Sequence, residues 1–189
     1  MRAGKLTIRD LVLCAMFTVL IAAGALIRIP VPVVPFTLQF LFTTLAGLLL
    51  GGRLGLISVC LYIALGLVGL PVFASGGGPA YIFQPSFGYL LGFAAGAWAT
   101  GRVANRRAEI SRGRLLAACF VGLAVVYAFG MAYCWAISKF YLGTDIGLWP
   151  LFLYCFVLAA PGDVALCFLS AELAWRMFHA KRVGEGIRT

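Results

Sequence analysis

Gly101–Arg114 reads GRVANRRAEISRGR, a polar stretch between two long apolar runs that carries five arginines. Lysine and arginine collect in the cytoplasmic loops of membrane proteins, so this stretch is predicted to be a cytoplasmic loop. Most other cations keep to alternate loops of the chain. They precede the first apolar run (Arg2, Lys5, Arg9), separate the second from the third (Arg53) or close the chain (Arg176, Lys181, Arg182, Arg188). Only Arg28 and Lys139 lie on the intervening loops.

This alternation predicts an even number of membrane crossings, with both termini in the cytoplasm. With 63% hydrophobic residues, 11% charged residues and a mean hydropathy of +1.03, the composition excludes an ordinary soluble domain. A crossing helix needs about 20 apolar residues. We therefore predict an all-α integral membrane protein of the cell membrane, one multi-pass domain over residues 1–189. Its six transmembrane helices are expected at Leu11–Ile29, Phe36–Leu50, Leu54–Val72, Tyr81–Thr100, Leu115–Ser138 and Pro161–Phe178.

Proline and glycine mark the predicted external loops. Pro30, Pro32 and Pro35 forbid regular helix after the first span, and residues 74–80 (ASGGGPA) form an uncharged, glycine-rich loop. The apolar stretch Leu148–Phe178 would make a helix of about 46 Å, which is too long for one bilayer. The Pro-Gly pair that begins at Pro161 divides it, so residues 148–160 are expected to cap the bundle at its outer face.

The absence of several patterns limits the function. No Gly-x4-Gly-Lys-Ser/Thr phosphate loop, His-Glu-x-x-His or Gly-x-Ser-x-Gly motif occurs, and no acid–base or nucleophile pair suggests an enzyme. The six cysteines lie singly in apolar runs, so no metal site or catalytic cofactor is expected. The net charge of +9 is explained by the cytoplasmic loops and by attraction to anionic lipid headgroups, and nucleic-acid binding is not expected.

Asp163 is the most informative single residue, because a carboxylate within a membrane protein is costly and indicates a functional site. As an alternative or an additional role, Asp163 is a helix N-cap. Arg28 ends the first span on the outer side, where it either reaches the lipid headgroups or binds an anionic solute. Gln39, Gln84 and Tyr89 add polar groups near external helix ends.

Two stripes of small residues predict close helix packing. Gly88, Gly92 and Gly96 recur every four residues in the fourth span, so a neighbouring backbone can approach closely. On the first span the stripe either packs within the bundle or faces a partner subunit; it consists of Ala15, Thr18, Ala22 and Ala25.

Several stretches together resemble the BioY family, the biotin-specific S components of energy-coupling-factor vitamin transporters. They are RIPVPVVPFTLQ (28–39), LLLGGRLG (48–55), GLVGLPVFA (66–74), GYLLGF (88–93) and PGD (161–163). The resemblance implies a six-helix protein that binds biotin at the outer face. Uptake would then need a transmembrane coupling protein and two ATPase subunits, in keeping with the missing phosphate loop. In the family the small-residue face of the first helix contacts the coupling protein; in this chain Val19 stands where alanine is usual.

The resemblance also implies how biotin would be held. Asp163 would accept a hydrogen bond from the ureido N–H groups, and Phe36, Phe73, Phe83 and Tyr89 would supply aromatic walls. The family tends to carry lysine three residues after the aspartate, where this chain has Leu166, so Arg28 is the hypothetical partner of the valerate carboxylate. Alternative functions are the same scaffold with another small carboxylate vitamin or a biotin precursor (lipoate, dethiobiotin), an intramembrane enzyme, or an envelope assembly protein.

Overall fold

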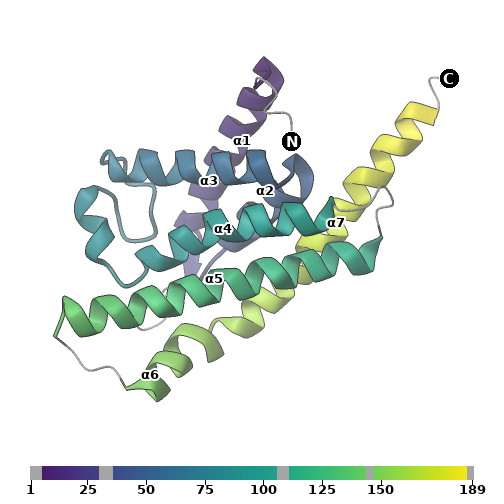
Figure 1. Ribbon diagram of the computed structural model, residues 1–189. Helices are drawn as coiled ribbons and strands as arrows, with labels where there is room; N and C mark the ends of the chain where they lie inside the picture. The colour runs from purple at the N-terminus through teal and green to yellow at the C-terminus, as the bar shows by residue number, and fades with distance from the viewer. Residues whose placement is uncertain (1–5, 30–35, 106–110, 144–146, 187–189) are drawn as a thin grey trace.

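The computed structural model describes residues 6–29, 36–105, 111–143 and 147–186, and these residues are helical almost throughout (Figure 1). Six α-helices have twelve residues or more: α1 (Ile8–Leu26), α2 (Gln39–Leu50), α3 (Gly52–Leu67), α4 (Phe87–Ala104), α5 (Arg112–Phe140) and α7 (Ala160–Gly186). Between them lie β1 (Arg28–Ile29), β2 (Phe36–Thr37), the 3₁₀ turn η1 (Pro79–Phe83), α6 (Leu148–Phe152) and the π-helical turn η2 (Leu153–Val157). The all-α prediction and the number of long helices are confirmed.

The helix bounds depart from the predicted spans where local chemistry intervenes. Helix α3 ends at Leu67 because Gly69 adopts a φ of 115°, which favours glycine, and a proline follows at position 71. Helix α4 begins at Phe87, six residues later than the predicted span, because the preceding residues form the 3₁₀ turn η1 instead. Helix α7 continues past the predicted end to Gly186. The three prolines at positions 30, 32 and 35 lie outside the described residues.

The glycine stripe of α4 faces α5, and the two helices run side by side along their length (Figure 1). A Cβ atom added at Gly88 would overlap the Cβ atom of Tyr133. One added at Gly92 would lie 2.8 Å from the carbonyl oxygen of Val126, and one at Gly96 would also press on α5. Larger side chains at these positions would therefore separate the two helices.

The small residues of α1 lie at the edge of its buried face. Thr18 and Ala25 are buried, and the Thr18 hydroxyl donates to the Ser58 carbonyl of α3 at 3.0 Å. Ala22 is half-buried and Ala15 is exposed. The stripe therefore packs within the bundle through two of its members and leaves Ala15 at the surface.

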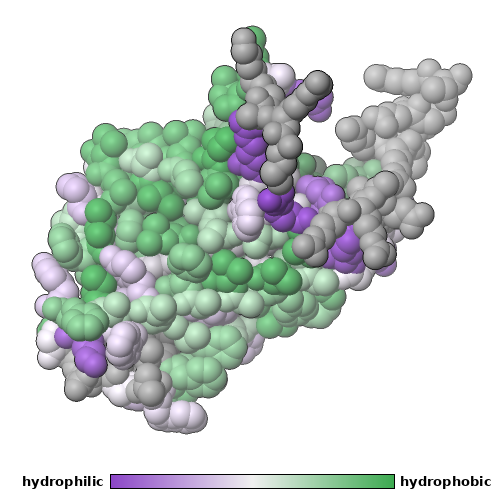
Figure 2. Space-filling view, viewed as in Figure 1, coloured by the Kyte–Doolittle hydropathy of each residue, from purple (hydrophilic) through white to green (hydrophobic). Residues whose placement is uncertain are grey.

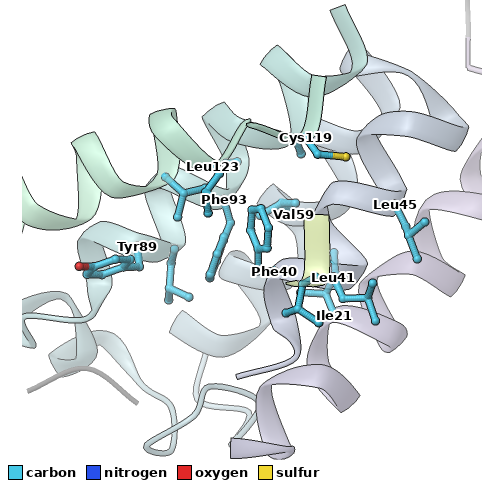
Figure 3. Close-up of a cluster of buried hydrophobic side chains, with 14 of the residues drawn as sticks. Ile21, Phe40, Leu41, Leu45, Val59, Tyr89, Phe93, Cys119 and Leu123 are labelled. Carbon is cyan, nitrogen blue, oxygen red and sulfur yellow. The ribbon is translucent and has the colours of Figure 1, made fainter. Parts of the chain in front are cut away.

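Hydrophobic side chains from several helices meet in one core (Figure 3). Near its centre the rings of Phe40 on α2 and Phe93 on α4 lie 6.5 Å apart. The visible surface in Figure 2 is broadly apolar across the middle of the bundle. Helices α1 and α5 have the length and hydropathy of membrane-crossing helices, and α2 and α3 are shorter apolar helices.

The start of α5 and the later part of α7 lie at the same end of the bundle (Figure 1), and arginines of both helices meet there. There Arg112 lies 3.6 Å from Glu172, and its guanidinium covers the ring of Trp175 at 3.7 Å. Arg176 donates to the same glutamate at 2.7 Å. A Cβ added at Gly101 of α4 would meet the backbone where α3 begins, so the α2–α3 junction also belongs to this end. We call it the basic end; its arginines include Arg53, Arg102, Arg112 and Arg176, which come from four different helices.

Candidate functional site

A cavity lies at the end of the bundle opposite the basic end, where α2, α4 and α7 begin. It is partly open to solvent, and the empty space between its walls is about 630 Å³ when the part open to solvent is included. Segments that are distant in the sequence supply its walls: β2, α2, the loop before η1, α4, α5 and the start of α7. The lining residues are Phe36, Thr37, Gln39, Phe40, Ala74, Tyr81, Ser86, Tyr89, Leu90, Phe93, Val126, Tyr127, Ala159 and Asp163.

The walls of the cavity are largely aromatic. The rings of Tyr89 and Tyr127 meet edge to face with centroids 6.2 Å apart, and Phe40 and Phe93 line the deeper part. Figure 3 shows these last two rings side by side, with Tyr89 at one edge of the cluster. Apolar and aromatic walls with a few placed polar groups are typical of small-molecule sites. Among the described lining residues there is one carboxylate and no lysine, arginine or histidine.

Asp163 supplies that carboxylate from the first turn of α7. The Tyr127 hydroxyl donates to its Oδ2 atom at 2.6 Å, a short hydrogen bond of the charge-assisted kind. Helix α7 begins at Ala160, so Asp163 lies inside the first turn and not at the N-cap position. An acid in the first turn is favoured by the helix dipole. Within the described residues no side chain donates to the other carboxylate oxygen, which therefore has an open hydrogen-bonding position.

Gln39 begins α2 on another wall of the cavity. Its side chain is 3% exposed, and within the described part of the chain its amide nitrogen Nε2 has no hydrogen-bond partner. The Tyr62 hydroxyl lies near this amide and donates to the Val72 carbonyl at 3.0 Å, but its oxygen does not accept a hydrogen bond from Nε2. A buried donor without a partner is costly, so Gln39 requires an explanation.

Four of the predicted residues lie outside the lining. Phe83, expected as an aromatic wall, is exposed and stacks on Tyr141 with ring centroids 4.6 Å apart. Arg28 is paired with Thr37 in the short β1–β2 ladder, and its guanidinium donates to the Ala74 carbonyl at the edge of the cavity. Phe73 is buried and packs behind Tyr81, with ring centroids 4.5 Å apart. Gln84 continues from η1, with its backbone N–H bonded to the carbonyl of Tyr81. Thus Asp163, Tyr89, Gln39 and Phe36 share the cavity lining, and the other four predicted residues lie outside it.

Several lining residues were not anticipated from the sequence. Tyr127 and Phe93 lie in the middle of apolar spans, Tyr81 lies within η1, and Ser86 follows it just before α4. The only signal for Tyr127 was a hydroxyl within the apolar run of α5, and a hydroxyl there needs a partner when buried. No group of three or more His, Cys, Asp or Glu side chains suited to a metal ion occurs among the described residues.

Two glycines let aromatic rings approach the helices around the cavity. A Cβ added at Gly130 of α5 would lie 2.5 Å from the Tyr89 ring. One added at Gly162, next to Asp163, would lie 2.6 Å from the ring of Phe36. Both distances are far below van der Waals contact, so the positions of these rings depend on the missing side chains.

Comparison with known proteins agrees with this arrangement. The model of the BioY family matches residues 1–182. A probable biotin transporter BioY of Lysinibacillus sphaericus is 43% identical over 179 residues, covering 95% of this chain and 91% of that protein. The biotin transporter BioY of Thermotoga maritima is 41% identical over 124 residues, covering 65% of this chain and 72% of that protein.

A solved structure shares the fold along almost the whole chain. It is the crystal structure at 2.1 Å of the S-component for biotin from an ECF-type ABC transporter. The two superpose with a TM-score of 0.76 at 26% identity, over 95% of each chain. The six-helix architecture is therefore that of an S-component, and the chain belongs to the BioY family.

Proposed function

We propose that this chain is a substrate-binding S component that captures biotin at the outer face of the cell membrane for ATP-driven uptake, and that it is not an enzyme. The observation that carries the proposal is the cavity, in which aromatic walls surround one carboxylate with an open hydrogen-bonding position. The family match and the names of the relatives support biotin over lipoate or dethiobiotin as the transported ligand.

The chemistry of biotin suits these walls. Its fused rings would lie among the aromatic side chains, and a ureido N–H group would donate to the free oxygen of Asp163. Tyr89 would pack against the rings from α4. The valerate tail would point to the rim, where Arg28 lies beside Ala74 and offers a cation to the carboxylate. Phe73 and Gln84 would support this rim from behind.

The proposed topology follows from the distribution of charge. Four arginines from separate segments share the basic end, and cytoplasmic ends of membrane proteins collect such residues. The cavity lies at the opposite end, which would face the outside. The protein would thus cross the membrane six times, with both termini in the cytoplasm.

Transport would need other chains. The sequence carries no Gly-x4-Gly-Lys-Ser/Thr phosphate loop, and the solved relative is a component of an ECF-type ABC transporter. We propose a transmembrane coupling protein and two ATPase subunits as partners. The exposed side of α1 around Ala15 is the candidate contact surface for the coupling protein.

Isothermal titration of the detergent-purified chain with biotin tests the proposal, with lipoate and dethiobiotin as competitors. Asp163→Asn is expected to weaken biotin binding by about 10- to 100-fold, because a hydrogen bond to a charged group is lost. Glu172→Gln is the matched control, since it removes a carboxylate of the same helix at the basic end. Folded protein that binds no biotin, or equal affinities of Asp163→Asn and the parent, would contradict the proposal.

A further inference from the structure

The unpartnered amide of Gln39 is the feature that the proposed site does not yet use. Its nitrogen is buried on a wall of the cavity, among described residues none of which accepts from it. The Ser86 hydroxyl donates to Tyr81 at 3.3 Å, and the Tyr127 hydroxyl donates to Asp163. These two wall hydroxyls are thus engaged, and Gln39 offers an N–H donor that awaits an acceptor.

Gln39 and Asp163 offer opposite hydrogen-bonding characters from different walls. Asp163 is on α7 and accepts, whereas Gln39 is on α2 and donates, and these two helices pack against each other. A cyclic urea has the complementary pattern, since its N–H groups and its carbonyl oxygen point in different directions within one plane. A ligand that satisfies both walls must therefore carry a donor and an acceptor, and a cyclic urea carries both on one small ring.

We propose that Gln39 determines specificity by donating from Nε2 to the carbonyl oxygen of the ligand's ring while Asp163 accepts from a ring N–H group. The inference rests on the proposed function, and it identifies the ring carbonyl and ring N–H group as the parts of the ligand that the site recognises. Lipoate carries no such pair of groups, so it would leave both the amide and the carboxylate unsatisfied. Sites built to hydrogen-bond a substrate reject analogues that lack its polar groups, because the polar groups of the site then stay buried and unpaired.

The test exchanges donor and acceptor on both partners. Biotin presents a ring carbonyl, whereas 2-iminobiotin carries a protonated C=N group there and can only donate. The parent chain, Gln39→Met and Gln39→Glu are titrated calorimetrically with both ligands, and a thermal melt checks that each variant is folded. The methionine removes the donor at nearly constant volume, and the glutamate replaces the donor with an acceptor.

The parent chain is expected to prefer biotin, and Gln39→Met should lose about 10- to 100-fold in biotin affinity. Gln39→Glu should reverse the preference, so that 2-iminobiotin binds more tightly than biotin. If Gln39→Glu does not fold, the ratio of the two affinities in Gln39→Met decides, since a purely structural role weakens both ligands equally. A ratio unchanged from the parent overturns the inference while the proposed function stands. A parent chain that binds no biotin overturns both.

Discussion

Removing the Tyr127 hydroxyl tests whether this residue orients Asp163. Tyr127→Phe deletes the donor 2.6 Å from Oδ2 of Asp163 and keeps the ring that packs on Tyr89 and on Phe156, the latter at 4.9 Å. A hydrogen bond to a charged group contributes about 1.5–3 kcal/mol. Asp163 is only half-buried, so water can replace part of the bond. We therefore expect the free energy of unfolding of the empty protein to fall by about 1.5 kcal/mol.

The effect on binding has a separate origin. Without the Tyr127 hydroxyl, the Asp163 carboxylate can rotate. The ligand must then immobilise this carboxylate when it binds. Fixing one such side chain costs about 0.5–1.5 kcal/mol, so the dissociation constant for biotin should rise roughly 2- to 10-fold. Isothermal titration of the parent and the variant measures this change, and a thermal melt measures the loss of stability.

Tyr133→Phe is the matched control for this experiment. It removes a hydroxyl from the same helix, one that donates to the Ile82 carbonyl outside the cavity lining, and it should leave biotin affinity unchanged. A double-mutant cycle with Asp163→Asn should give a coupling energy above about 0.5 kcal/mol, as expected for residues in direct contact. Unchanged affinity in Tyr127→Phe, or strictly additive effects in the cycle, would refute the positioning role.

Two further substitutions test other parts of the site. Gly130→Ala would place a Cβ atom 2.5 Å from the Tyr89 ring, so it should weaken biotin binding although alanine favours helix by about 1 kcal/mol; an unchanged affinity by titration would mean that the ring shifts without consequence. Arg28→Ala should weaken biotin by no more than about fivefold, because the guanidinium is exposed and such pairs contribute about 1 kcal/mol at most. Biotin amide, which lacks the carboxylate, should bind the parent and Arg28→Ala with equal affinity. If the substitution weakens the binding of biotin and biotin amide equally, the role of Arg28 is to hold the Ala74 backbone in place.

The sequence could predict the helices because the relevant signals are local. Apolar runs separated by polar and proline- or glycine-rich segments predict six long helices without knowledge of any tertiary contact. Gly69, near which α3 ends before its predicted bound, and the 3₁₀ turn η1, which forms the start of the span predicted at 81–100, show where this reasoning loses accuracy. A hydropathy pattern records which residues avoid water, and it does not record which of them keep α-helical hydrogen bonds.

The site was predictable in part for a similar reason. Asp163 and Gln39 stand out because polar side chains are rare in an apolar chain and need partners. Tyr127 and Phe93 do not stand out, because their helices are apolar on every side and only the rotation of each helix decides which face meets the cavity. Arg28 is close to the site along the chain, yet its side chain is not itself part of the lining and instead donates to the carbonyl of the lining residue Ala74.

The start of α7 shows how local chemistry and long-range packing combine at this site. Proline is tolerated in the first turn of a helix, so Pro161 permits α7 to begin at Ala160. Asp163 therefore lies in the first turn of this helix. Gly162 leaves room for the ring of Phe36 from β2. On the other side, the π-helical turn η2 brings Phe156 against Tyr127, and π-helical turns are frequent at functional sites. The Tyr127 hydroxyl thus orients the carboxylate before any ligand arrives, and the rings of Phe36 and Phe156 pack beside Gly162 and Tyr127 respectively. Substituting either ring should therefore alter ligand affinity even though neither ring needs a polar contact with the ligand.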